Sequence, residues 1–170
     1  VVDWMRVGFI HGVMNTDNMA ISGETIDYGP CAFMDTYDPE TVFSSIDYHG
    51  RYAYFNQPSV ARWNLERFAE SLIPLIDDNK DKAVEIAKEI INSFVEKYKK
   101  NWFEMMHKKL GLIGEESKDE NLIIDLLSWM HQNKADYTNT FCFLMNENIQ
   151  ENKIYNNQGF ISWKQQWQER

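Results

Sequence analysis

Apolar side chains recur at three- and four-residue intervals through the second half of the chain, which is the period of a helix with one buried face. The clearest run covers residues 83–98 and predicts about four turns of amphipathic helix. Its apolar positions are Ala83, Val84, Ala87, Ile90, Ile91, Phe94, Val95 and Tyr98.

Other stretches carry the same period or the signals that begin and end a helix. Ser117-Lys118-Asp119-Glu120 has the form of a capping box and predicts a helix through residues 122–130. A further helix is expected over residues 60–72, ending near Pro74, and the polar run 77–82 reads as a connection or a helix start. Shorter helices are expected around residues 102–110, 136–145 and 162–168.

The first part of the chain has a different character. All four prolines and five of the eight glycines precede residue 75, so this part is expected to be rich in turns. We therefore divide the chain into residues 1–75, which carry any chemistry, and residues 76–170, the helical remainder of the same unit. Functional side chains are often held on such irregular segments by a rigid scaffold.

Composition narrows the class of protein. The 170 residues are 44% hydrophobic with a formal net charge of −9, which indicates a globular chain and disfavours nucleic-acid binding. No apolar run is long enough to cross a membrane. Two cysteines, Cys31 and Cys142, favour a reducing, cytoplasm-like compartment. Because the chain opens on Val1 without an initiator Met, it looks like a piece of a longer protein.

One turn-rich segment predicts a metal site. If Ser22-Gly23 forms a two-residue hairpin loop, Asn18 lies directly opposite Asp27, with Cβ atoms roughly 4.5–5.5 Å apart. An amide oxygen and a carboxylate at that separation can share a hard divalent cation such as Mg²⁺. The small side chains of Ala20 and Thr25 would leave room above the pair. A slip of one residue would remove this arrangement.

The same segment has the spacing of a protein-kinase catalytic loop. His11 and Asn18 are separated as the kinase His and metal-binding Asn are, and Asp27-Tyr28-Gly29 stands where Asp-Phe-Gly would. Val13 occupies the position of the kinase catalytic Asp and cannot accept a proton. By kinase rules alone the chain is a pseudokinase, and Asp17 is the nearest available carboxylate.

A longer match extends this pattern to a named family. Residues 4–75 closely resemble the selenoprotein O (SelO) family, and the helical remainder matches in character. The matching segments are Val7-Gly8-Phe9-Ile10-His11-Gly12-Val13-Met14-Asn15-Thr16-Asp17-Asn18-Met19, Thr25-Ile26-Asp27-Tyr28-Gly29-Pro30, Phe33-Met34-Asp35, Tyr37-Asp38-Pro39, His49-Gly50-Arg51-Tyr52, Asn56-Gln57-Pro58 and Trp63-Asn64-Leu65.

The resemblance implies a mainly α, protein-kinase-like C-lobe with a small β-hairpin carrying the metal site. It implies a protein adenylyltransferase (AMPylator) that transfers AMP from ATP to Ser, Thr or Tyr hydroxyls of proteins. Asp17 matches the family's proposed catalytic base, Asn18 and Asp27 match its Mg²⁺ or Mn²⁺ ligands, and Asp27 also contacts ATP. Uridylyl transfer with manganese has also been proposed for bacterial members.

The family's phosphate-cradling Gly-rich loop, with its Lys and Arg contacts, has no counterpart in this sequence, and neither has its C-terminal redox-active Cys or selenocysteine. We therefore expect a C-lobe fragment whose partner is the missing N-terminal lobe, inactive when isolated and located in a bacterial cytoplasm.

Simpler interpretations remain beside these. Asp17-Asn18 can be an ordinary turn or cap, and so can Asp27-Tyr28-Gly29-Pro30. His11 is expected to be structural, His49 is a candidate for substrate binding or for a structural role, and surface or boundary positions are expected for His107 and His131. The alternative functions are a kinase-like phosphotransferase that uses Asp17 as its base, and a non-catalytic helical interaction domain.

Overall fold

The computed structural model describes residues 1–146 and 153–170, and most of these residues are helical. The expectation of a mainly α fold with little sheet is confirmed. In chain order the elements are α1 (Val2–Val7), β1 (Phe9–Ile10), η1 (Thr16–Asn18), β2 (Ala32–Phe33), η2 (Tyr54–Asn56), α2 (Gln57–Ile76), α3 (Lys80–Leu110), α4 (Asp119–Asn133), α5 (Tyr137–Met145), η3 (Lys153–Asn156) and α6 (Gln158–Glu169).

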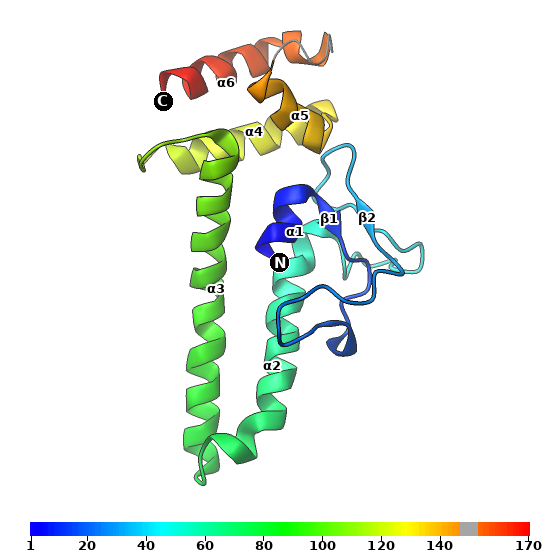
Figure 1. Cartoon of the computed structure of the whole chain (residues 1–170), viewed down its shortest axis with the longest axis vertical. Helices are drawn as coiled ribbons and strands as arrows, with labels where there is room; N and C mark the ends of the chain where they lie inside the picture. Colours follow the sequence, from blue (N-terminus) through cyan, green and yellow to red (C-terminus); the bar gives the residue numbers. More distant parts are fainter. Residues whose placement is uncertain (147–152) are drawn as a thin grey trace.

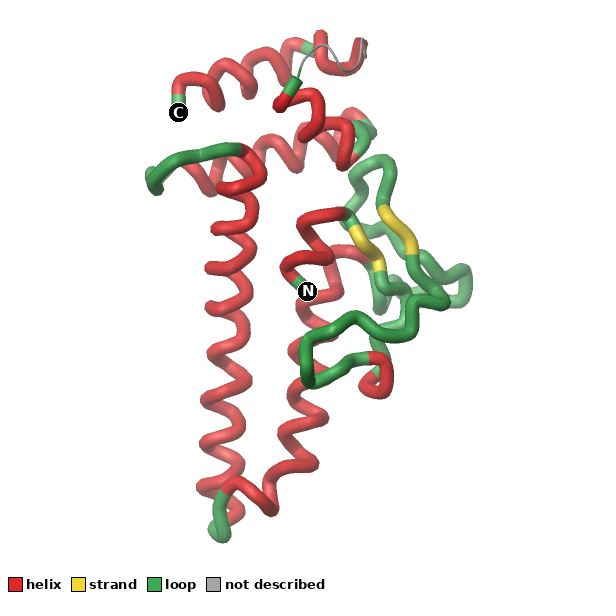
Figure 2. Tube along the Cα trace, in the orientation of Figure 1, coloured by secondary structure: helices red, strands yellow, loops and turns green. Residues whose placement is uncertain are grey.

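Helices α2 and α3 form a long antiparallel pair that organises the molecule (Figure 1). Helices α4, α5 and α6 gather at one end of α3, and the short α1 lies between this group and α2. The strands and the irregular segments that precede α2 lie together on one side of that helix (Figure 2). None of the described helices is both long enough and apolar enough to span a membrane.

The two strands form a short antiparallel sheet. Phe9 pairs with Phe33 and Ile10 with Ala32, and the Met34 amide donates to the carbonyl of Gly8 at 2.8 Å. Residues 11–31 therefore leave and return to the scaffold at adjacent points. We call this segment the site loop, because it contains every site residue predicted from the sequence.

The α2–α3 pair is longer than the sequence pattern predicts. Helix α2 continues past Pro74 to Ile76, so the expected end near Pro74 is close but early. Residues 77–79 connect the helices, and the Asn79 side chain caps α3 by accepting from the amides of Asp81 and Lys82. Helix α3 then runs without a break through both the 83–98 and the 102–110 segments, because no Gly or Pro separates them.

Helix α4 begins differently from the prediction. The expected capping box at Ser117 is wrong: Lys118 is the N-cap residue and makes no side-chain capping bond. Asp119 instead accepts a hydrogen bond from the Glu116 amide at 2.8 Å. The helix itself is confirmed, and Leu122 and other apolar residues on one face are buried.

The main core lies where α1 meets the ends of α2, α3, α4, α5 and α6. The backbone carbonyl of Met5 accepts hydrogen bonds from the hydroxyls of Tyr54 (2.6 Å) and Tyr137 (2.8 Å). Burial raises the pKa of Tyr137 to about 12, so this phenol remains a proton donor. The predicted core residues Met105, Met106, Trp129 and Met130 are buried here, and Trp102 packs against them half-buried.

Candidate functional site

Asp17 and Asn18 lie on η1, a single 3₁₀ turn in the site loop. The turn closes when the Asn18 amide donates to the carbonyl of Asn15 at 3.0 Å. The Asn18 side chain donates from Nδ2 to the carbonyl of Val13, also at 3.0 Å, which leaves its amide oxygen for another partner. Asp17 is exposed to solvent, so its carboxylate is accessible to a ligand.

Asp27 has a backbone conformation that few non-glycine residues adopt. Its φ of 55° lies in the left-handed region, which Asp tolerates better than most residues. The side chain is exposed, and its Oδ1 lies 3.8 Å from the point where a Cβ of Gly29 would stand. This is an ordinary van der Waals distance, so Gly29 and the Asp27 carboxylate lie side by side without crowding.

The segment carrying Asp27 is fastened to the beginning of the site loop on both sides of Asp27. Before it, the carbonyl of Ile26 lies 2.9 Å from Nε2 of the buried His11. After it, the carbonyl of Pro30 lies so close to Gly12 that a Cβ on Gly12 would stand only 2.3 Å away. Gly12 also has a φ of 86°, so both space and conformation require glycine here.

The structure contradicts the predicted pairing of Asn18 with Asp27. The hairpin is reduced to one antiparallel bridge, between Met19 and Thr25, so its register is shifted by one residue and Asn18 faces Ile26. The shift arises because the loop has five residues rather than two, closed by a hydrogen bond from the Gly23 amide to the carbonyl of Ala20. A hydrogen bond from Nε1 of Trp4 to Oγ1 of Thr25, at 2.8 Å, holds this register.

Two buried side chains of α2, which were assigned no role from the sequence, support the site loop. Gln57 accepts from the His11 amide at 3.0 Å and donates to the carbonyl of Phe9 at 2.9 Å. Asn64 donates to the carbonyl of Met14 at 2.9 Å. The sequence does hold a signal, since Gln57 and Asn64 are seven residues apart and share a helix face with apolar Val60.

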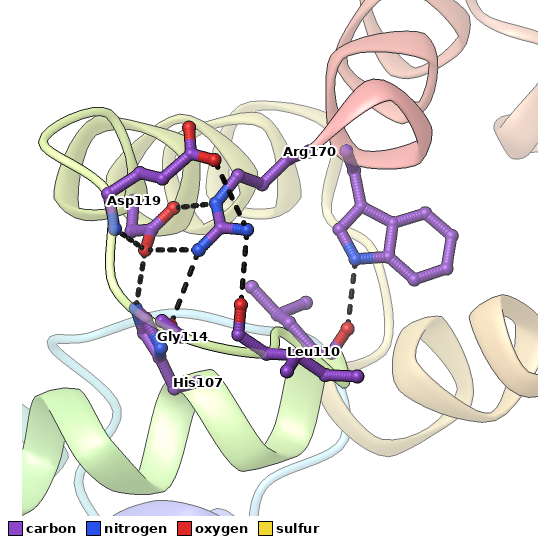
Figure 3. A network of polar contacts seen from close by, with 8 residues as sticks. His107, Leu110, Gly114, Asp119 and Arg170 are labelled. Carbon is purple, nitrogen blue, oxygen red and sulfur yellow. Dashed lines mark hydrogen bonds and ion pairs between the residues drawn. The ribbon is translucent and has the colours of Figure 1, made fainter.

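The four histidines differ in burial, and His49, the candidate for substrate binding or a structural role, is exposed. His11 is fully buried and packs beside Trp4 and Phe9, as a structural residue would. His131 is exposed as expected. The expectation for His107 is wrong: it is buried, with Nε2 3.0 Å from Oδ2 of Asp119 in a network far along the chain from the site loop (Figure 3).

Charged clusters alone do not define a metal centre in this chain. Across residues 1–146 and 153–170, no group of three or more His, Cys, Asp or Glu side chains could hold a metal ion. A cation at the site loop would need the oxygens of Asn18 and Asp27 together with phosphate or water oxygens. Such an all-oxygen donor set fits Mg²⁺ or Mn²⁺.

An open groove borders the site loop. It has a volume of about 770 Å³ and lies between Gly12, Val13 and Asn15 on one side and residues 44–52 on the other. The first residues of α2 contribute to its lining. The hydroxyl of Tyr52 donates to Oδ1 of Asn15 at 2.5 Å, which joins the two walls close to η1.

With this geometry established, comparison with known proteins assigns the family. The family model described as protein adenylyltransferase SelO matches residues 1–170. The chain belongs to the SelO family. The resemblance inferred from residues 4–75 is therefore confirmed, and it extends over the helical part as well.

Curated relatives of this SelO-family chain are named protein nucleotidyltransferase YdiU. The protein from Pelagibacter ubique is 63% identical over all 170 residues, which cover 35% of its own length. Those from Alcanivorax borkumensis and Nitrosococcus oceani are each 58% identical over all 170 residues, covering 35% and 34% of their lengths. The chain thus spans about a third of the length of these relatives.

Proposed function

We propose that this chain is the acceptor-activating and metal-binding part of a protein adenylyltransferase, which transfers AMP from ATP to Ser, Thr or Tyr hydroxyls of proteins. The observation that carries the proposal is the fastening of the Asp27 segment to His11 and Gly12, which keeps Asp27 on the same loop framework as Asp17 and Asn18. The family description and the relatives' names support nucleotidyl transfer as the reaction class.

The proposed framework is the C-lobe of a kinase-like enzyme, in which residues 1–75 hold the catalytic and metal-binding segment and residues 76–170 complete the same lobe. The proposal of a kinase-like C-lobe is supported by the order and placement of the elements around the motif. A kinase-like motif, from His11 through Asn18 to Asp27-Tyr28-Gly29, is bounded by one antiparallel pair of strands and backed by α2.

Each site residue has a task in this proposal, and Asp27 has two, since it also contacts ATP. Asn18 and Asp27 hold Mg²⁺ or Mn²⁺, and the bound cation supplies neutralisation of the phosphate charge. The acceptor hydroxyl oxygen forms a bond to the α-phosphorus of ATP while the bond from that phosphorus to the bridging oxygen breaks, and pyrophosphate leaves. The proton of the hydroxyl passes to the exposed carboxylate of Asp17, which acts as general base.

The remaining contacts to ATP are assigned to other parts of a longer polypeptide. The relatives are about three times as long as this chain, and an N-terminal lobe would provide the phosphate-holding groups that this sequence lacks. The isolated chain is therefore expected to be inactive. The cytoplasm of a bacterium, where ATP is abundant, is the proposed location.

Labelled nucleotides test this function in the full-length protein. With [α-³²P]ATP and either Mg²⁺ or Mn²⁺, we expect label on protein hydroxyls, and with [γ-³²P]ATP we expect none. Label from the γ-phosphate would instead establish the alternative phosphotransferase. Label from [α-³²P]UTP but not from ATP would identify UTP as the donor nucleotide. The absence of label from every nucleotide would favour a non-catalytic helical interaction domain.

A further inference from the structure

The loop of residues 44–52 has a fixed conformation although most of it is exposed. Both carboxylate oxygens of Asp47 are used within it: Oδ1 accepts from the Arg51 amide at 2.9 Å and Oδ2 from the Tyr52 amide at 2.8 Å. The Asn56 side chain donates to the carbonyl of Gly50 at 2.7 Å, which ties the loop to the start of α2. We call this segment the groove loop, because it forms one wall of the groove beside Asn15.

The groove loop exposes apolar side chains that have no covering in the described part of the chain. Ile46 is 76% exposed and Tyr48 is 84% exposed, and both line the groove. Large apolar side chains grouped on a rigid surface are typical of a site that binds another molecule. Because Asn15 directly precedes η1, a chain lying in this groove would reach the turn that carries Asp17.

Arg51 supplies the positive charge of the groove. Its guanidinium carbon lies 4.8 Å from the ring centre of Trp63 and 5.6 Å from that of Tyr52, so the two rings orient it. Among the described residues no carboxylate forms an ion pair with the Arg51 side chain. Asp47 also lines the groove and keeps its negative charge, but both of its oxygens are directed to the backbone amides of Arg51 and Tyr52.

Arg67 provides an internal comparison. Its guanidinium carbon also lies over Trp63, at 5.2 Å, but its Nη2 forms an ion pair with Glu70 at 2.7 Å. Arg67 does not line the groove. Of these two stacked arginines, only Arg51 lines the groove and only Arg51 is without an ion pair among the described residues, in a chain whose formal net charge is −9.

We propose that this groove docks the acceptor protein, and that Arg51 selects acceptors with an acidic side chain near the modified hydroxyl. The proposal rests on the proposed function. Ile46 and Tyr48 would contact the apolar part of the acceptor segment, and a Glu or Asp of the acceptor would pair with the preoriented guanidinium. Arg51 is thus a specificity residue and takes no part in the chemical step.

Synthetic acceptor peptides test the proposal in the full-length protein. Three peptides share a central Thr and differ only in flanking residues, which are Glu, Gln or Lys, and transfer is measured from [α-³²P]ATP. We expect the wild-type kcat/KM for the Glu peptide to exceed that for the Gln peptide by about tenfold, the scale of a charge-assisted hydrogen bond. Direct binding of fluorescein-labelled peptides, measured by anisotropy, should follow the same order.

Substitutions assign the preference to Arg51. Arg51→Gln should bring the Glu and Gln peptides within about twofold of each other, Arg51→Lys should retain part of the preference, and Arg51→Glu should favour the Lys peptide. The KM for ATP should not change in these variants. Arg67→Gln, which removes the other arginine over Trp63, should leave the peptide order unaltered.

Several results would overturn the proposal. The first is a wild-type enzyme that shows no preference for the Glu peptide in either transfer or anisotropy. The second is a preference for the Glu peptide that survives Arg51→Gln. The third is an Arg51 variant with a raised KM for ATP and an equal loss of kcat/KM for all three peptides. The last result would make Arg51 a phosphate ligand. If neither peptides nor bulk protein accept label from ATP, the proposed function itself fails; label on protein without charge preference rejects only the acceptor selection.

Discussion

Arg170 closes over the carboxylate of Asp119, with Nε 2.5 Å from Oδ1 and Nη2 3.0 Å from Oδ2 (Figure 3). The two residues are 51 positions apart, and the Asp119 side chain is completely buried. Nη2 of Arg170 also donates to the carbonyl of Gly114 at 3.3 Å. This pair therefore attaches the end of α6 to the beginning of α4.

Replacing Asp119 should loosen this attachment. In Asp119→Asn the guanidinium loses its buried charged partner and keeps only the exposed Glu116, whose Oε1 lies 3.6 Å from Nη1. Removing one member of a buried pair is far more disruptive than removing an exposed charge. We expect amide hydrogen exchange in α6 and in residues 114–118 to accelerate roughly tenfold or more. Asp125→Asn, an exposed carboxylate on the same helix, is the matched control and should exchange like the wild type.

The pair of Asp119 and Arg170 also predicts how the protection of α6 amides from hydrogen exchange depends on pH. Hydrogen bonding from Arg170 is the main reason why the pKa of Asp119 lies below its ordinary value of 3.8. A carboxyl group whose pKa is lowered by folding contributes its full stabilisation above the pKa of the unfolded state. It loses that stabilisation as the pH falls through the pKa of the folded state. The ratio of the α6 amide protection factors of the wild type and Asp119→Asn should stay constant above about pH 4 and should approach one below it. A difference that instead widened on acidification would contradict this assignment.

The attachment also illustrates what local sequence patterns miss. The helical segments were predictable because a 3.6-residue apolar period is a local signal, and α3 and α4 follow it closely. The capping box expected between Ser117 and Glu120 is equally local but does not form. The start of α4 is instead held by Asp119, whose carboxylate bonds to Arg170, a partner too far along the chain for a local pattern to include. His107, on α3, is buried beside the same Asp119 carboxylate, which is a contact between two helices.

Gly12 and Gly23 offer a matched test of the site loop. Both have a positive φ, 86° and 80°, so alanine at either position is strained by roughly 1–2 kcal/mol. A Cβ on Gly12 would also stand 2.3 Å from the carbonyl of Pro30, whereas a Cβ on Gly23 would meet nothing within 4 Å. Gly12→Ala should therefore lower the free energy of unfolding by about 2–5 kcal/mol and Gly23→Ala by about 1–2 kcal/mol in urea denaturation. Equal effects would contradict the close approach.

The fine geometry of the site loop was beyond sequence reasoning for a related reason. A two-residue turn at Ser22-Gly23 was predicted, but the turn that forms is centred on Ile21 and Ser22 and is closed by the Gly23 amide. The pairing of Met19 with Thr25 beside it is held by the bond from Trp4 to Thr25, 21 residues away. Asp27 was identified as a candidate from its motif, whereas neither its left-handed backbone nor the close approach of Gly12 to Pro30 has a local signal in the sequence.

Gln57 should matter for stability although it makes no contact with solvent. Gln57→Leu leaves the His11 amide and the Phe9 carbonyl without their buried partner. An unsatisfied buried polar group costs about 1–3 kcal/mol, so we expect the free energy of unfolding to fall by roughly 2–4 kcal/mol. Gln132→Leu, at an exposed position of α4, is the control and should change it by less than about 0.5 kcal/mol. A Gln57→Leu variant as stable as this control would contradict the bridging role.

The separate tasks proposed for Asp17 and for the metal ligands predict two different kinetic effects in the full-length protein. Asp17→Asn removes the proton acceptor, so kcat should fall by about 10²–10⁴-fold while the Mg²⁺ concentration for half-maximal rate stays unchanged. Asp27→Asn and Asn18→Ala weaken the oxygen donor set, so they should raise that Mg²⁺ concentration as well as lowering the rate. Glu24→Gln removes an exposed carboxylate from the same site loop and should leave both quantities unchanged. If Asp17→Asn shifted the Mg²⁺ requirement as strongly as Asp27→Asn, Asp17 would be a metal ligand and another group would take the proton.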